Sequence, residues 1–276
     1  MRARAGGGVG GSVTPLVERW QGAGNVYLLV DARELTQPLT AATATALVAE
    51  CGGDGVLELS TGSAGADVSM RIWNPDGSES EACGNGTRMV ARWASERLGQ
   101  ADISIATAAG VLPCHVDGET ITARLAPATL AGPQYRPNDE AFPYVHTFVS
   151  VGNPHVVIPV DDVDAFPLAT QGPLLEHHSW FPERANVEIT TMLDRHHLRM
   201  RVWERGVGET PACGSGACAA AVAAVATGVA DSPVTVMLPG GELVIEVGDD
   251  GGVTMHGPAE RIESFELPPT ILSLLA

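Results

Sequence analysis

The most informative absence in this 276-residue sequence is lysine, because all 16 of its basic residues are arginine. Without lysine the chain cannot form the Schiff base that holds pyridoxal phosphate, nor the phosphate-binding loop that ends in Gly-Lys-Ser/Thr. The arginines are outnumbered by 33 acidic residues, which gives a net charge of -17. Nucleic-acid binding requires clustered positive charge, so we expect no nucleic-acid partner.

Long apolar runs and paired cysteines are missing as well. No stretch approaches the roughly 20 apolar residues that a membrane span requires, and residues 1–14 are Gly-rich, so we expect them to be a disordered lead-in. The five cysteines are odd in number and irregularly spaced, which is not the pattern of a disulfide framework. No Cys-x-x-Cys or helical histidine pair indicates a metal site. We therefore expect a cytoplasmic protein with no membrane segment, no metal and no cofactor.

The local pattern predicts many short strands and few helices. Apolar and β-branched runs bounded by Gly, Pro, Asn or Asp predict strands at 25–31, 55–60, 68–74, 103–107, 146–152, 155–160, 198–204 and 241–247. Helical patterns occupy residues 40–50, 86–99 and 214–228, and the last two end at glycine. This mixture indicates an α+β protein with one principal helix in each half.

A repeat relates the two halves. Without gaps, residues 70–93 and 200–223 share nine identical positions of 24, including Trp73 with Trp203 and Cys83 with Cys213. Duplication of a domain of about 130 residues explains this similarity. If a pseudo-two-fold axis relates the halves, the two cysteines can face one another across the interdomain cleft, where ligand sites commonly form.

The chemistry of this arrangement follows from the Cys-Gly-x-Gly context of Cys83 and Cys213 at two predicted helix starts. Unpaired N–H groups and the helix dipole favour a thiolate there, so we expect both thiols to ionise readily. The glycines allow backbone N–H groups to approach an anion such as a carboxylate. A thiolate on one face of an amino-acid α-carbon and a thiol on the other would invert its configuration. Cys51, Cys114 and Cys218 lack this context, and we expect them to be structural.

Two long segments, residues 73–93 and 201–223, resemble the signature segments of the diaminopimelate epimerases, two-cysteine enzymes of lysine and peptidoglycan biosynthesis that need no cofactor. Three further segments of the chain also resemble the family, and they follow one another in the expected order. The resemblance implies two similar α+β domains, each a mixed strand array around a central helix, with the active site in the cleft between them. We expect residues 15–126 plus 267–276 to form the first domain and residues 127–266 the second. The three segments are residues 22–31, 152–158 and 183–189.

The resemblance also implies a reaction and a set of site residues. Cys83 and Cys213 would interconvert LL- and meso-diaminopimelate. Arg205 would bind the distal carboxylate, while Glu204 and the asparagines would recognise the distal ammonium and carboxylate groups. His155 would lie close to the site, where anchoring a loop and relaying a proton are both open. The substrate-binding set is Asn25, Asn74, Gly84, Asn85, Asn153, Asn186, Glu204, Arg205, Gly214 and Ser215.

The first half departs from the family pattern in three places. Gln21 and Val26 replace the usual residues, and residues 52–55 are one residue shorter than their counterpart. Two alternatives therefore stay open beside the epimerase: a racemase of the same fold for another amino acid such as histidine, and a non-catalytic solute-binding protein. The expected partner of the enzyme is a small-molecule amino-acid substrate. A homodimer is also open, since dimers are frequent in the family and among soluble enzymes.

Overall fold

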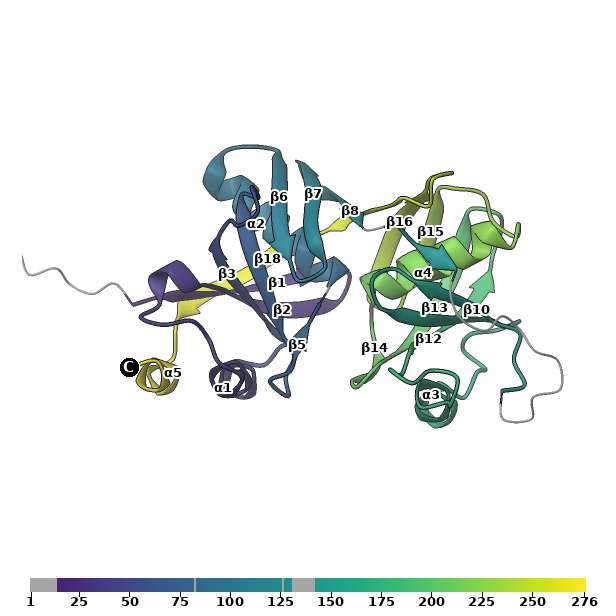
Figure 1. Cartoon of the computed structure of the whole chain (residues 1–276), viewed down its shortest axis with the longest axis horizontal. Helices are drawn as coiled ribbons and strands as arrows, with labels where there is room; N and C mark the ends of the chain where they lie inside the picture. Colours follow the sequence, from purple (N-terminus) through teal and green to yellow (C-terminus); the bar gives the residue numbers. More distant parts are fainter. Residues whose placement is uncertain (1–13, 82, 126, 131–141) are drawn as a thin grey trace, which may run out of the picture.

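The computed structural model describes residues 14–81, 83–125, 127–130 and 142–276. The chain forms two lobes that lie side by side, with the first half of the sequence in one lobe and most of the second half in the other (Figure 1). Nearly all of the predicted lead-in, residues 1–13, lies outside the described residues. The two-lobed α+β architecture confirms the predicted fold class.

The first lobe wraps strands around the central helix α2 (Gly84–Leu98). Cys83 caps the start of α2, and the helix ends at Gly99, whose left-handed backbone (φ 69°) suits glycine. The other elements are β1 (Leu16–Gly22), β2 (Asn25–Asp31), the 3₁₀ helix η1 (Ala32–Glu34), α1 (Ala41–Cys51), β3 (Val56–Thr61), β4 (Val68–Trp73), β5 (Glu79–Ser80), β6 (Asp102–Thr107), β7 (Gly110–Asp117), β8 (Thr120–Leu125), β18 (Glu260–Glu266) and α5 (Pro269–Leu274).

The second lobe repeats this plan around helix α4 (Gly214–Ala226), which begins at Cys213. Alanines fill most of α4 and are buried, so their small side chains let the surrounding strands pack close to the helix. The other elements are β9 (Thr129–Leu130), β10 (Thr147–Ser150), β11 (Pro154–Pro159), α3 (Leu168–Glu176), β12 (Asn186–Met192), β13 (His197–Glu204), β14 (Gly208–Thr210), β15 (Val234–Leu238), β16 (Gly241–Val247) and β17 (Val253–Pro258).

The strand pairing confirms the repeat that the sequence predicts. In the first lobe β2 and β3 are parallel, β3 and β4 are antiparallel, and Val56 lies opposite Trp73. In the second lobe β11, β12 and β13 pair in the same way, and Val187 lies opposite Trp203. The two tryptophans that align the halves in sequence therefore occupy equivalent positions in the two sheets.

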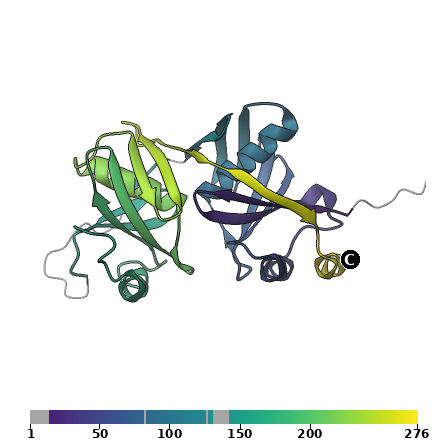
Figure 2. The same cartoon turned by 180° about the vertical axis from the view of Figure 1, so that it is seen from behind.

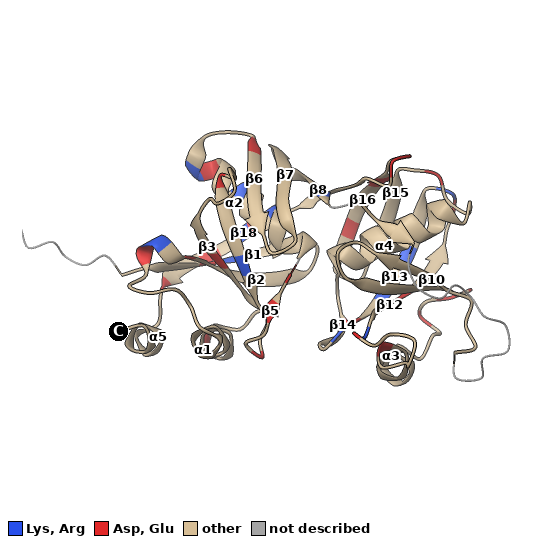
Figure 3. Cartoon of the chain, viewed as in Figure 1, with Lys and Arg blue, Asp and Glu red and all other residues tan. Residues whose placement is uncertain are grey.

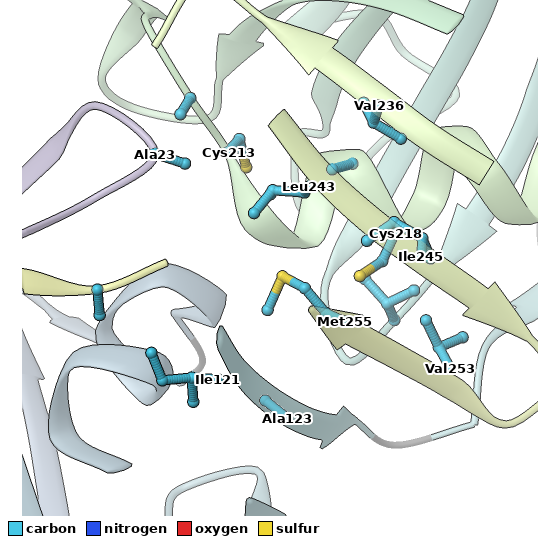
Figure 4. Close-up of a cluster of buried hydrophobic side chains, with 14 of the residues drawn as sticks. Ala23, Ile121, Ala123, Cys213, Cys218, Val236, Leu243, Ile245, Val253 and Met255 are labelled. Carbon is cyan, nitrogen blue, oxygen red and sulfur yellow. The ribbon is translucent and has the colours of Figure 1, made fainter. Parts of the chain in front are cut away.

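The lobes are joined by strand pairing and by a shared apolar core. β8 of the first lobe pairs antiparallel with β17 of the second, from Thr120 opposite Pro258 to Leu125 opposite Val253. The apolar cluster around this pair continues from Ile121 into the second lobe (Figure 4). Sheet and core are thus continuous between the two lobes.

The chain returns to the first lobe earlier than predicted. Strand β18, assigned above to the second domain (127–266), pairs with β1 of the first lobe, where Phe265 lies opposite Val17 (Figure 2). β2 pairs with one edge of β1 and β18 with the other, so β18 supplies hydrogen-bond partners for the backbone groups of an edge that would otherwise be exposed. The crossing between lobes therefore follows β17 and precedes β18.

The outer surface carries charge of both signs. The arginines are scattered over the two lobes and do not gather in one patch in the view of Figure 3. Among the described residues, no helix is both long and apolar enough to cross a membrane.

Candidate active site

Two cysteines hold equivalent positions at the starts of the two central helices. Cys83 and Cys213 both have extended backbone, and each sulfur accepts a hydrogen bond from the amide three residues later, Gly86 N at 3.2 Å and Gly216 N at 3.3 Å. This is the geometry that an N-capping side chain adopts. The side chain of Cys213 is buried and that of Cys83 is partly buried.

The starts of the two helices face one another across the lobe boundary. A Cβ atom added to Gly214 would lie 3.2 Å from the Cα of Gly84 and 3.2 Å from the backbone nitrogen of Asn85. A Cβ atom on Gly84 would in turn lie 3.3 Å from the Cα of Gly214 and 2.8 Å from the Cε of Met255. Glycine after each cysteine therefore allows two helix N-termini from different lobes to meet.

A cavity of about 300 Å³ lies between the lobes at this meeting point. Both cysteines line it, as do all ten residues predicted to bind substrate. Tyr27, Asp54, Ser80, Arg184 and Thr210 also line the cavity and were missed from the sequence. The predicted residues that it brings together are Cys83, Cys213, Asn25, Asn74, Gly84, Asn85, Asn153, Asn186, Glu204, Arg205, Gly214 and Ser215.

Some of the missed residues had a signal in the sequence. Tyr27 follows Asn25 by two positions in one strand, so both side chains project from the same face of β2. Ser80 and Thr210 occupy matching positions in the repeat. Arg184 lies in the segment 183–189 that resembles the family, but its backbone turns with a positive φ of 59°, and no periodicity there indicates where its side chain points.

A polar network fixes the first-lobe wall of the cavity. The Nδ2 of Asn25 donates to Asp54 Oδ2 at 3.2 Å, and its Oδ1 accepts from Asn85 Nδ2. The Oδ1 of Asn85 accepts in turn from the buried guanidinium of Arg88 at 2.8 Å. Burial lowers the pKa of Arg88 to about 10, and the two thiols Cys83 and Cys218 act in the opposite direction. The asparagines here are held by side-chain partners rather than by turn formation alone.

The second-lobe wall brings an arginine to the cavity without a carboxylate partner. Glu209, four residues further along the chain, pairs with Arg201 at 2.8 Å. Within the described parts of the chain, Arg205 forms no ion pair, and its Nη1 donates to the carbonyl of Glu183 at 3.2 Å. Its backbone N–H donates to Asn186 Oδ1 at 2.9 Å, which fixes the base of the loop. The guanidinium of Arg205 is thus available to a ligand carboxylate.

Glu204 contacts one of the two sulfurs. It accepts hydrogen bonds from the Thr210 hydroxyl and from Cys213. Burial raises the pKa of Glu204, while those two hydrogen bonds oppose the shift.

The expected ready ionisation of both thiols is wrong for this form of the protein. Burial raises the pKa of Cys83, although the hydrogen bonds from Tyr27 and Gly86 N–H oppose it. Burial raises the pKa of Cys213 much further, because the charges of Glu204 and Glu188 add to it. The helix-start amides do favour the thiolate, but desolvation outweighs them. The two sulfurs are therefore unequal, and Cys83 is the more readily ionised.

Three other sequence features lie outside the cavity lining. His155 is fully buried behind Asn153, whose Oδ1 lies 2.9 Å from His155 Nε2. Gln21 pairs with Glu260 on the exposed face of β1, and Val26 donates its N–H to Asp54 at 2.8 Å. Of the three departures from the family pattern, only the shortened segment 52–55 reaches the cavity, through Gly53 and Asp54.

Comparisons with known proteins show the family and the fold of the chain. A family model described as diaminopimelate epimerase matches residues 20–130 and 147–262. The diaminopimelate epimerase of Rhodospirillum centenum is 43% identical over 269 residues, covering 92% of each chain. That of Synechococcus elongatus is 43% identical over 267 residues, covering 89% of this chain and 95% of the relative. A solved hydroxyproline epimerase from Agrobacterium vitis, with bound trans-4-OH-L-proline, is similar in fold with a TM-score of 0.72 at 13% identity, covering 94% of this chain and 93% of the other.

Proposed function

The chain belongs to the diaminopimelate epimerase family, and from that premise we propose that it interconverts LL- and meso-diaminopimelate by proton transfer at Cys83 and Cys213. It is an isomerase of the amino-acid epimerase class. The observation that carries the proposed mechanism is that both sulfurs cap facing helices and line one cavity. A substrate α-carbon between them would have one sulfur on each face.

The helix starts supply the site for the α-carboxylate. The first amides of an α-helix have no acceptor within the helix. The third amide of each helix is taken by a cysteine sulfur, so the first two remain, those of Gly84 and Asn85 and those of Gly214 and Ser215. These four N–H groups, with two helix dipoles behind them, stabilise the negative charge that reaches the carboxylate when the α-proton leaves.

The reaction is a transfer of one proton on each side of the α-carbon. A thiolate removes the α-proton, the electron pair of the C–H bond delocalises onto the carboxylate, and the opposite thiol returns a proton to the other face. The first sulfur ends as a thiol and the second as a thiolate, so the charge of the pair is unchanged. Glu204 opposes the thiolate at both sulfurs. Because Tyr27 and Arg88 favour the thiolate at Cys83 while Glu188 further opposes it at Cys213, we assign Cys83 as the thiolate of the resting enzyme.

The remaining polar residues select the substrate. We assign Glu204 to the α-ammonium group, since it sits beside Cys213. We assign Arg205 to the distal carboxylate, since its guanidinium has no acidic partner among the described residues and its planar shape suits a bidentate contact. Asn74, Asn153 and Asn186 complete the distal end. A shorter amino acid would leave these polar groups without ligand partners, which disfavours its binding.

The test is exchange of the α-proton with deuterated solvent. We expect exchange and epimerisation of diaminopimelate by the wild-type protein, and a loss of about 10²- to 10⁴-fold in Cys83→Ala and in Cys213→Ala. Cys218→Ala is the matched control, because it removes a buried sulfur from the same helix α4 outside the cavity. Turnover of a monocarboxylate amino acid without turnover of diaminopimelate would refute the substrate assignment, and an active Cys83→Ala or Cys213→Ala variant would refute the mechanism.

The chemistry also bears on where and in what form the enzyme works. Two free thiols are needed, so we place it in a reducing cytoplasm. Because dimers are frequent among soluble enzymes, we also propose a homodimer, which light scattering of the purified protein tests directly.

A further inference from the structure

A buried chain of side chains leads from the cavity to the start of α4. Asn153 lines the cavity, and its Oδ1 lies 2.9 Å from His155 Nε2. The other ring nitrogen, Nδ1, lies 2.7 Å from Glu188 Oε1, and the side chains of His155 and Glu188 are both 0% exposed. The second oxygen of Glu188, Oε2, is buried and has no hydrogen-bond partner among the described residues. A buried carboxylate with one orphan oxygen is costly for the fold.

The hydrogen-bond pattern fixes which groups carry protons. An amide oxygen can only accept, so the Nε2 of His155 carries a proton and donates it to Asn153. A second proton lies between Nδ1 and the Glu188 carboxylate, because otherwise two acceptors would face each other. With its oxygen engaged, Asn153 has its NH₂ group left for a ligand. Glu188 thus determines the orientation of Asn153 through His155.

The other lobe shows that the fold does not require this pair. Val56 and Val187 are equivalent because each lies opposite a repeated tryptophan. The residues that follow them, Leu57 and Glu188, are therefore equivalent too. Leu57 packs beneath the start of α2, 3.0 Å from a Cβ built on Gly86, just as Glu188 Oε1 lies 2.8 Å from one built on Gly216.

The same register relates the aromatic residues of the two lobes. Leu28 lies opposite Val56, and Val156 lies opposite Val187. The preceding residues Tyr27 and His155 are therefore equivalent. The pair Tyr27 and Leu57 in the first lobe therefore corresponds to the pair His155 and Glu188 in the second.

We propose that Glu188 and His155 are positioning residues, a buried pair that fixes the amide of Asn153 and thereby orients the substrate in the cavity. This inference rests on the proposed epimerase function. Neither residue lines the cavity, so the pair acts on the substrate through Asn153. The first lobe has Leu57 at the position equivalent to Glu188, so the backbone of the second lobe should also accommodate the leucine of Glu188→Leu.

The test compares two substitutions of Glu188. Glu188→Gln can donate its amide to His155 Nδ1 and so preserve the chain to Asn153; we expect its KM for diaminopimelate to stay within threefold of the wild-type value. Glu188→Leu breaks the chain, and we expect kcat/KM to fall about 10- to 100-fold, mainly through KM, as for the loss of a buried hydrogen bond. If Glu188→Leu does not fold, His155→Phe makes the same test with a ring like that of Tyr27.

A double-mutant cycle separates positioning from general damage. In an Asn153→Ala background, Glu188→Leu should cost less than threefold, because its only target has gone. In an Asn25→Ala background it should cost its full amount, since Asn25 is held by Asp54 and Asn85 in the other lobe. Glu58→Gln is the structural control: this buried carboxylate accepts from Trp73 Nε1 at 3.0 Å and should lower stability without raising KM.

The alternative is that Glu188 acts on Cys213 through its charge. Cys213 faces Glu204 from β13, Glu188 from β12, and Ser215 and the Gly216 N–H from α4. A Glu188→Gln variant as impaired as Glu188→Leu, with Cys213 alkylated at lower pH than in the wild type, would overturn the positioning role. Additive effects of Glu188→Leu and Asn153→Ala would overturn it as well. Failure of the proposed function is distinct, because the wild-type protein itself would then not turn over diaminopimelate.

Discussion

Replacement of Gly214 by alanine probes the contact between the two helix starts. The new Cβ would lie 3.1 Å from the Asn85 Oδ1, 3.2 Å from the Asn85 backbone nitrogen and 3.2 Å from the Gly84 Cα. Two of these three atoms are backbone of the opposite lobe, so the strain can be relieved only if the helices move apart by a few tenths of an ångström. Overpacking of this kind costs about 1 to 3 kcal/mol.

The effect should appear in catalysis rather than in stability. Alanine is favoured over glycine in a helix by about 0.5 to 1 kcal/mol, which offsets part of the strain in the free protein. In catalysis both helix starts must contact one carboxylate, so we expect kcat/KM to fall about 5- to 150-fold, which corresponds to the same 1 to 3 kcal/mol. Gly214→Ser, with one further atom, should be more severe.

The measurement is the rate of α-proton exchange of Gly214→Ala in deuterated solvent, together with its thermal unfolding followed by circular dichroism. A folded Gly214→Ala variant with kcat/KM within twofold of the wild-type value would refute the idea that catalysis requires this close approach of the two helix starts. A large drop in melting temperature with normal kcat/KM would refute it too.

Three further predictions concern the distal contact, the buried thiols and oxidation. Arg205→Gln should raise KM for diaminopimelate about 10- to 100-fold, as for loss of a charge-assisted hydrogen bond, and steady-state kinetics would contradict the assignment if KM were unchanged. Burial raises the pKa of Cys218 and of Cys114 to about 12 from an ordinary value of 9.0. The folded protein therefore retains protons that the unfolded chain releases, and its free energy of unfolding should fall as pH rises from about 9 to 12. When this free energy is measured by urea unfolding and plotted against pH, Cys218→Ala should show a fall that is shallower by up to about 1.4 kcal/mol per pH unit. Mild oxidation should inactivate the enzyme by joining Cys83 to Cys213, a thiol reductant should restore it, and mass spectrometry finding both thiols intact after inactivation would contradict this.

Sequence periodicity and the internal repeat predicted the two central helices and part of the strands, but not β8 and β17, which join the lobes. The helices predicted at residues 86–99 and 214–228 correspond to α2 and α4, since apolar spacing and a closing glycine are local signals. Helix α3 was not predicted, because Gly172 and Pro173 interrupt its pattern and packing against Trp203 holds it in place. The pairing of β18 with β1 was also beyond the sequence, because it joins residues about 240 positions apart.

The site was predictable as a set of residues but not as an electrostatic environment. All twelve predicted cavity residues line one cavity, because the family motifs and the repeat identify positions. The protonation of the thiols depends on burial and on charges from other strands, such as Glu188 beside Cys213, and no local pattern reports these. For the same reason, the role of Glu188 emerges only from comparing the two lobes in three dimensions.

The return of β18 to β1 means that neither half of the polypeptide is a self-sufficient folding unit. A fragment ending at residue 126 would leave β1 with an unpaired edge and would lack α5, while the complementary fragment would carry a strand with no sheet to join. If the two fragments were produced separately, each would expose an unpaired strand edge and should aggregate. Mixing the two fragments during refolding should restore the enzyme. A strand at residues 260–266 thus completes the sheet that begins at residue 16.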